Sequence, residues 1–351
     1  ISMHQDESEK RRYIDDWDHL NRELGAIEQF DGNLLNVVQR LRDHQLDSGF
    51  IRDDLYAVQY FDFPHPDDPE RFLSVQYNPA RVNRLRIRVG ALPPSREDAV
   101  NNDCLLCSTN IEWQHRGIEF GYAIELNEHP FNIWMNAYPL MPLHLVVTTQ
   151  EHIPQAWDLG DARMRQFSID EIVANLASMA QRLPGFVGFY NGDGAGTSVP
   201  AHFHYQFFKR RNGGDLFPLE LAPVRQIADL VAEIEDYPVH AMRWCGNDMD
   251  EVIARASVWI NDWLSMNLET RPGLSGNIFA MTDASGKLLH IYFVPRDKEL
   301  GHSPRMAGMV GSLEILGELV LTTENEKRDL DWGKVDYRSI ARILSDISVP
   351  L

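Results

Sequence analysis

The segment "GDGAGTSVPAHFHYQFFKR", residues 192–210, contains the side chains whose types and spacing are best suited to chemistry. His202, His204 and Gln206 occupy alternate positions, and alternate residues of a β-strand point to the same face. We therefore expect two imidazoles and one carboxamide in a row on one face of a strand. The aromatic residues between them face the other way, and we expect them to enter the core.

A loop of small residues, with Gly192, Gly194 and Gly196, comes directly before this strand. Glycines let backbone N–H groups approach a phosphate closely. A neutral histidine beside a bound nucleotide is a candidate nucleophile, because its attack on the α-phosphorus forms a phosphoramidate and divides one difficult displacement into two easier ones. The other ring nitrogen must then be held as a donor, usually by a backbone carbonyl. The pattern indicates phosphate chemistry.

The cysteines Cys104 and Cys107, separated by two leucines, have the spacing of zinc ligands. A tetrahedral site needs two further ligands, for which we choose His152 and His202, with His144 as the second choice. Zinc bound through His202 would fix the start of the histidine strand, away from bond making. The alternative interpretation is that both cysteines are small buried residues.

Composition and charge restrict the class of protein. The chain has 351 residues, and 52 acidic against 33 basic side chains give a net charge of −19. This charge argues against a general nucleic-acid binder, since phosphate backbones are held by surplus Lys and Arg. No apolar run approaches the roughly 18 to 20 residues that span a bilayer, and the first residues lack the apolar core of a secretory signal. The low number of cysteines favours a reducing, cytoplasmic setting over a disulfide framework.

The order of elements predicts an α+β protein. Helical apolar spacing occurs at residues 9–48, 163–182 and 250–268, and also towards the end of 218–238. Strand-like runs occur at residues 56–91, 122–139, 143–152, 185–191, 202–210, 239–244 and, as a hairpin, 276–296.

Two strand sequences indicate an internal duplication. "HYQFFKR" from His204 and "HIYFVPR" from His290 share the spacing His-x-x-Phe-x-x-Arg, and only the first keeps the second histidine and the glutamine. Seven positions are few, so a chance echo is the alternative.

The run "YNGDGAGTSVPAHFHYQ" resembles the nucleotidyltransferase and phosphorylase branch of the histidine-triad superfamily. This branch includes galactose-1-phosphate uridylyltransferase, diadenosine tetraphosphate phosphorylase and the GDP-hexose phosphorylases, and the resemblance is strongest to a bacterial group near the last of these. It covers about residues 70–325. It implies a HIT-like fold with two related antiparallel-sheet halves and flanking helices. We expect an N-terminal helical extension, a catalytic half and a degenerate half at residues 1–60, 61–215 and 216–351.

Carried over by position, the resemblance makes His204 the nucleophile, Gln206 the residue that binds the α-phosphate oxygens and Ser198 a phosphate donor. It implies structural zinc at Cys104, Cys107, His152 and His202. We place further nucleotide or phosphate contacts at Asn191, Gly194, Gly196, Asn136, Gln76, Asn78, Arg81, Lys209 and Arg296. The sequence departs from its relatives at Phe203, where they carry Pro, Leu or Lys, but this side chain should face the core.

The resulting hypothesis is a nucleotide-sugar phosphorylase or nucleotidyltransferase of ping-pong type. A nucleotide sugar or dinucleotide and inorganic phosphate are its expected substrates, and a homodimer is one assembly we consider. In this scheme His204 attacks an NDP-hexose and expels hexose 1-phosphate, and phosphate then releases NDP. Three alternatives stay open: a hexose-1-phosphate nucleotidylyltransferase of the uridylyltransferase type, a diadenosine polyphosphate phosphorylase or hydrolase, and a non-catalytic, zinc-stabilised nucleotide-binding protein.

Overall fold

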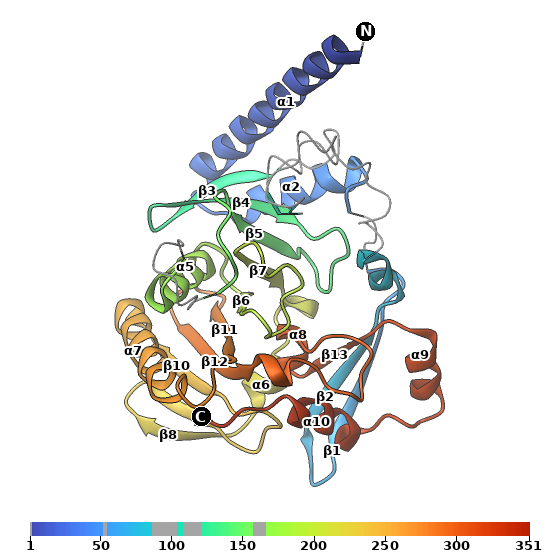
Figure 1. The fold of residues 1–351 in the computed structure, drawn as a ribbon, viewed down its shortest axis with the longest axis vertical. Coiled ribbons are helices and arrows are strands. Elements are labelled where there is room, and N and C mark those ends of the chain that lie inside the picture. Colours follow the sequence, from blue (N-terminus) through green and yellow to red (C-terminus); the bar gives the residue numbers. More distant parts are fainter. Residues whose placement is uncertain (1, 52–54, 86–103, 105, 108–120, 157–165) are drawn as a thin grey trace.

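An antiparallel sheet of ten strands forms the centre of the protein, with the strand order β3-β4-β5-β7-β6-β11-β12-β10-β9-β8 (Figure 1). The computed structural model describes residues 2–51, 55–85, 104, 106–107, 121–156 and 166–351. The first five strands along the chain are β3 (Tyr122–Leu126), β4 (His129–Met135), β5 (Leu145–Thr149), β6 (Phe186–Asn191) and β7 (His204–Lys209). The other five are β8 (Val224–Ala228), β9 (Val231–Ile234), β10 (Met242–Gly246), β11 (Leu274–Thr282) and β12 (Leu289–Asp297).

Both groups of five strands follow the same connectivity. Three strands pair in sequence, a helix follows, and a final hairpin adds its second strand beside the third strand of the group. The two helices, α5 (Ile169–Arg182) and α7 (Met249–Asn267), contact each other. Helix α5 begins at a capping box in which the side chains of Ser168 and Glu171 satisfy free backbone N–H groups. Its buried face enters one of the two hydrophobic cores.

A smaller sheet packs against the second hydrophobic core. It consists of β1 (Gln59–His65), β2 (Asp68–Tyr77) and β13 (Glu318–Leu321), with β13 parallel to β2. The short helices around it are α6 (Pro218–Leu221), α8 (Ser312–Ile315), α9 (Glu324–Asp331) and α10 (Tyr337–Asp346). The hairpin of residues 59–77 therefore pairs with the C-terminal part of the chain.

The N-terminal region is helical, as its periodicity predicts. Helix α1 (Ser2–Asp31) projects away from the rest of the molecule in Figure 1, and α2 (Leu35–Asp47) contacts β4. Gly32, with φ of +66°, lies at the break between the two helices. No helix in the described part of the chain combines the length and hydropathy that crossing a bilayer requires.

Some of the expected elements are wrong. Residues 218–238, expected to end in a helix, contain the hairpin β8–β9 instead, because β9 pairs with β10 and buries Val231 and Ile234. The helix expected from residue 163 begins at Ile169, and residues 163–165 lie outside the described ranges. After β2, Pro79–Leu85 forms a 3-10 helix rather than a strand, and residues 86–91 are again outside the description.

Candidate active site and metal centre

His204 is the first residue of β7, and the surrounding backbone fixes its tautomer. Its Nδ1 lies 2.9 Å from the carbonyl oxygen of His202, which can only accept a hydrogen bond. Nδ1 therefore carries the ring proton, and Nε2 keeps a free lone pair. Burial lowers the pKa of His204 to about 4, so the ring is neutral near pH 7. This is the protonation state that nucleophilic attack through Nε2 requires.

Gln206 lies two residues further along β7, on the same face as His204. Its Oε1 is 2.9 Å from Nε2 of His144, a buried residue at the start of β5. The sequence offered His144 as a second choice for zinc, but the structure places it against Gln206, outside the cysteine cluster.

Gln155 connects the end of β6 to the start of β7, and the sequence did not identify it as a site residue. Its Oε1 accepts a bond of 2.7 Å from the backbone N–H of His204, and its Nε2 donates to the carbonyls of His204 and Asn191 at 2.9 and 3.0 Å. The side chain is fully buried. It lies 49 residues from His204 in the chain. No periodic pattern links such distant positions, so the sequence carried no signal for it.

The glycine loop between β6 and β7 is held by a network of amides. Asn191 Oδ1 accepts hydrogen bonds from Asn277 Nδ2, at 2.7 Å, and from the Ser312 hydroxyl, and Asn277 Nδ2 also donates to the carbonyl of Ala195 at 2.9 Å. Gly196 has φ of +93°, and a Cβ there would lie 2.4 Å from Cα of Gly311. Only glycine therefore lets the loop turn so close to the neighbouring segment.

Arg296, expected to contact phosphate, lies inside this network. Its Nη1 donates to Asn277 Oδ1 at 2.9 Å and to the Val310 carbonyl at 3.0 Å, and the side chain is fully buried. Burial lowers its pKa to about 10. In this position the guanidinium supports the glycine loop indirectly, through its hydrogen bond to Asn277.

Two other expected phosphate contacts lie in different surroundings. Ser198 is exposed at the end of the glycine loop. Lys209 occupies an odd position relative to His204 on β7, so its half-buried side chain lies on the opposite face of the strand. The structure thus places Lys209 on the face of β7 opposite to His204.

A pocket of about 260 Å³ opens beside the glycine loop. Gly194, Gly196 and Thr197 line one side of it, and Gly301, His302 and residues 306–309 line the other. The Thr197 hydroxyl is buried and has no hydrogen-bond partner among the described residues. The larger side chains of the walls are those of His302, Met306 and Met309.

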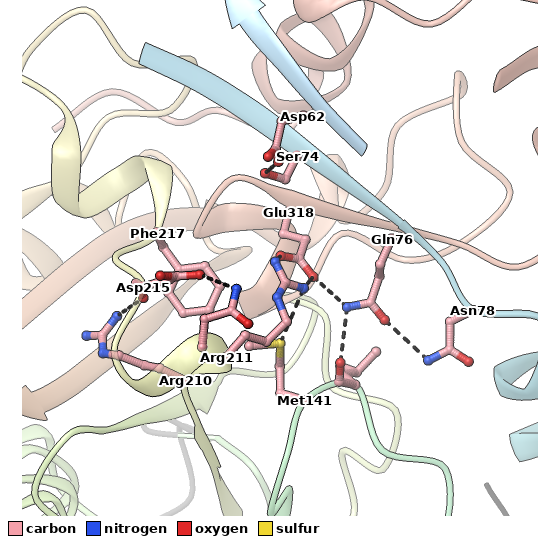
Figure 2. Close-up of polar contacts among 12 residues, drawn as sticks. Asp62, Ser74, Gln76, Asn78, Met141, Arg210, Arg211, Asp215, Phe217 and Glu318 are labelled. Atoms are coloured by element: carbon pink, nitrogen blue, oxygen red, sulfur yellow. Dashed lines mark hydrogen bonds and ion pairs between the residues drawn. The ribbon is translucent and has the colours of Figure 1, made fainter. Parts of the chain in front are cut away.

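The expected contacts Gln76 and Asn78 belong to a buried network that ties β2 to β13 and to the β4–β5 connection (Figure 2). Gln76 Nε2 donates to Glu318 Oε1 at 2.6 Å and to the Leu140 carbonyl at 3.1 Å. Asn78 Nδ2 donates to Gln76 Oε1 and to the Pro139 carbonyl, both at 3.2 Å. Both side chains are fully buried.

Arg81 and Asn136 hold the same connection. Arg81 Nη1 donates to the Tyr138 carbonyl, and Asn136 Oδ1 accepts from the Tyr138 N–H at 3.0 Å. Together with Gln76 and Asn78, these residues fix residues 136–140, which lead into His144.

Arg210 and Arg211, the basic residues after β7, form ion pairs with other parts of the chain. Arg210 pairs with Glu220, with N–O distances of 2.5 and 2.7 Å. Arg211 pairs with Glu318 at similar distances and stacks over the Tyr60 ring. Both guanidinium groups therefore connect elements of the fold.

The four expected zinc ligands form one cluster. The ligand atoms of Cys104, Cys107, His152 and His202 all lie within 4.8 Å of one another. Nε2 of His202 donates to the Thr149 carbonyl at 2.8 Å, so Nδ1 has the lone pair and faces both cysteine sulfurs at 3.5 Å. The hydrogen bond from the Cys107 thiol lowers the pKa of the Cys104 thiol, which favours the thiolate that a metal ion binds.

This donor set fits zinc. Zn–S and Zn–N bonds of about 2.3 and 2.0 Å at a tetrahedral centre separate sulfur from nitrogen by about 3.5 Å. The bond from His202 to a backbone carbonyl is the usual way in which a ligating imidazole is oriented. His202 also supplies the carbonyl that holds the His204 proton, so the cluster and the candidate nucleophile share one residue.

Sequence comparisons identify relatives for parts of the chain. A family described as "Domain of unknown function (DUF4922)" matches residues 53–209. The galactose-1-phosphate uridylyltransferase of Staphylococcus carnosus (strain TM300) is 26% identical over 150 residues, which are 40% of this chain and 27% of that protein. The enzyme of the same name from Clostridium perfringens (strain 13 / Type A) is 22% identical over 185 residues, covering 48% and 33%. The alignments thus cover a third or less of these curated relatives.

Solved structures match nearly the whole chain. Yeast Ap4A phosphorylase Apa2 in complex with Ap4A has a TM-score of 0.55 at 14% identity, over 90% of this chain and 98% of that one. The same protein in complex with AMP gives 0.55 at 12% identity, over 88% and 97%. Identities this low establish a shared fold. Over part of its sequence the chain is thus similar to galactose-1-phosphate uridylyltransferases, and over most of its length it shares the fold of Ap4A phosphorylase.

Proposed function

We propose that the protein is a nucleotide-sugar phosphorylase that works through a nucleotidyl group bound to His204. The observation that carries this proposal is the neutral, buried His204 ring whose Nδ1–H is held by the His202 carbonyl. In the first step the Nε2 lone pair attacks the α-phosphorus of an NDP-hexose, the bond to the bridging oxygen breaks, and hexose 1-phosphate leaves. In the second step inorganic phosphate attacks the same phosphorus, the P–N bond breaks, and NDP leaves.

Charge that builds on the α-phosphate oxygens needs donors fixed before reaction. Gln206 is suited to this role because its Oε1 is already occupied by His144, which leaves its N–H groups for a ligand. Ser198 and the backbone N–H groups near Gly194 and Gly196 are the further donors that we assign. Each donor of such a preorganised array typically contributes about 3 kcal/mol to transition-state stabilisation.

The metal that we propose is structural zinc, held by Cys104, Cys107, His152 and His202. When bound, zinc would supply a rigid tetrahedral anchor. Through His202 this anchor would fix the carbonyl that holds the Nδ1 proton of His204. The residues that contact substrate would remain those of β7 and the glycine loop.

A dinucleoside polyphosphate phosphorylase is the second candidate, and the pocket beside the glycine loop favours it. Besides Thr197 and His302, the walls of this pocket contain Met306 and Met309. Methionine sulfur makes favourable contacts with aromatic rings, including those of a nucleobase.

We also infer that the chain contains two related halves, at residues 61–215 and 216–351. The strand order 3-4-5-7-6 in the first half is repeated as 8-9-10-12-11 in the second. The shared spacing His-x-x-Phe-x-x-Arg falls on β7 and β12, which occupy equivalent places in this order. The second half would then be a degenerate copy that supports the first.

The experiment that tests the proposed function uses a panel of UDP-, GDP- and ADP-hexoses together with Ap4A, each with and without inorganic phosphate. Mass spectrometry should find a nucleotidylated peptide containing His204 when phosphate is absent, and NDP plus hexose 1-phosphate when it is present. Turnover of Ap4A alone would select the second candidate. Exchange only with hexose 1-phosphates would identify a nucleotidyltransferase, and stable nucleotide binding without any product would reject catalysis.

A further inference from the structure

The carboxamide of Gln206 has two chemically different ends. Only the NH₂ end can donate to phosphate oxygens, and an oxygen directed at the phosphate would repel it. Rotation by 180° about the last side-chain bond exchanges the two ends at almost no steric cost. Some neighbouring group must therefore determine which end of Gln206 faces the site.

His144 is in contact with the oxygen end. The backbone N–H of Leu140 lies 3.0 Å from Nδ1 of His144, and a backbone N–H can only donate. Nδ1 must therefore hold a lone pair, and the single proton of the neutral ring is on Nε2. That Nε2–H points at Gln206, 2.9 Å away, and requires an acceptor there. The acceptor is Oε1, so the NH₂ end is directed elsewhere.

Protonation of His144 would remove this selection, and the surroundings oppose it. The side chain is 1% exposed, and burial together with the nearby positive charge of Arg81 lowers its pKa to about 3. A proton added at Nδ1 would also meet the N–H of Leu140. The ring thus stays in one tautomer.

The backbone that selects this tautomer is itself fixed from the other side. The carbonyl of Leu140 accepts from Gln76, and the N–H of Asn136 donates to the His144 carbonyl at 2.7 Å. The network in Figure 2 therefore extends through Leu140 and His144 to Gln206.

We propose that His144 is a positioning residue that orients the Gln206 carboxamide with its N–H groups toward the nucleotide phosphate. This assignment of a role rests on the proposed function for its chemistry, while the tautomer of His144 follows from the hydrogen bonds alone. His144 would not touch the substrate. It would act by keeping Oε1 of Gln206 away from the phosphate oxygens.

The first test needs no substrate. Protein labelled with ¹⁵N-histidine should give long-range ¹H–¹⁵N correlations in which His144 Nε2 is protonated and Nδ1 is not, at pH 7. The spectrum of His144→Gln identifies the His144 signals by their loss. A protonated Nδ1, or a cationic ring at pH 7, would overturn the proposal.

The second test is a double-mutant cycle on the rate of nucleotidyl transfer to His204, measured with the best donor of the NDP-hexose and Ap4A panel. Gln206→Leu should slow transfer about 100-fold, as for loss of one transition-state donor, and His144→Phe about 10- to 100-fold. The double variant should be no slower than Gln206→Leu within about twofold, because His144 acts through Gln206.

A conservative variant separates positioning from folding. The amide of His144→Gln can accept from Leu140 and donate to Gln206, so it should recover at least about tenfold of the rate lost in His144→Phe. Multiplicative effects in the double variant, or a wild-type rate in His144→Phe, would reject the positioning role. If the wild-type protein transfers no nucleotidyl group to His204 from any donor, the proposed function fails, and the tautomer measurement alone decides the state of His144.

Discussion

Strands β7 and β12 occupy equivalent places in the large sheet, yet their polar side chains have very different surroundings. His204 on β7 has its Nδ1 bonded to a carbonyl, whereas Nδ1 of His290 on β12 is buried without a partner among the described residues. Two positions further along, β7 carries Gln206 and β12 carries the buried Tyr292. Nε2 of His290 lies 3.8 Å from the sulfur of Cys245.

The connections that precede the two strands also differ. Residues 192–203 join β6 to β7, whereas only residues 283–288 join β11 to β12 in a tight turn. The longer connection carries the glycine loop and His202. The two groups of strands therefore pair in the same order. The candidate chemistry depends on the longer loop before β7 and on the residues that bond to the ends of this loop.

The largest expected difference is in turnover. His204→Ala should lower nucleotidyl transfer by at least about 10⁴-fold, since loss of a nucleophile removes the covalent route. His290→Ala is the matched control on the equivalent strand and should stay within about threefold of wild type. Rates from single-turnover assays and unfolding curves measure both. If the two variants lost the same fraction of the transfer rate, the assignment of the nucleophile to β7 would be wrong.

Metal content should follow the same division. Within the described ranges the cysteine–histidine cluster, which includes His202 just before β7, is the only such group of possible metal ligands. Cys107→Ser should therefore lose bound zinc and more than about 3 kcal/mol of unfolding free energy, because metal binding and folding are coupled. Cys245→Ser should keep both. Elemental analysis and urea unfolding give the readouts, and a metal-free wild-type protein would contradict the expectation.

Gln155 tests whether the hydrogen bonds around β7 matter for rate as well as for stability. Gln155→Leu leaves the N–H of His204 unpaired, so we expect a loss of about 2 to 3 kcal/mol of unfolding free energy and slower transfer by about tenfold or more. The control is Gln45→Leu, another buried glutamine, which accepts from the backbone N–H of Met135 and makes no bond to β7. It should lose stability and keep its rate. Equal rates in both variants would make Gln155 purely structural.

A further difference concerns stability at acid pH. The folded pKa of His144, about 3, is below its ordinary value of 6.5, so the unfolded chain binds the proton first. The unfolding free energy should therefore fall as pH falls from about 6.5 to 3, by up to about 1.4 kcal/mol per pH unit for this group. His144→Gln should flatten this slope in urea titrations. His290→Gln, at a half-buried position, should flatten it less, and identical slopes would contradict the difference.

The sequence predicted the parts of the site that follow from local pattern. Alternation placed His204 and Gln206 on one face of β7, and the cysteine spacing led to the cluster with His152 and His202. Strand alternation and the spacing of the two cysteines act over a few residues, whereas the choice of His152 and His202 depended on the chemistry of zinc ligands.

Burial and long-range pairing could not be predicted in this way. Arg296 and Gln76 are polar residues at plausible distances from the site, yet both are fully buried in the scaffold because amide and carbonyl partners meet them there. Residues 224–234 have helical apolar spacing, but pairing with β10 outweighs that preference. The role of Gln155 depends on contacts across 49 residues.

The pairing of β2 with β13 has a consequence for the time at which the site is completed. Gln76 and Glu318, which bond across this pairing, are separated by 242 residues. Contacts of such sequence separation form late, because a long loop must close first. During synthesis on the ribosome, β7 and its histidines emerge before β13 does. The network that reaches Leu140 and His144 thus gains its Glu318 partner only after nearly the whole described chain has been made.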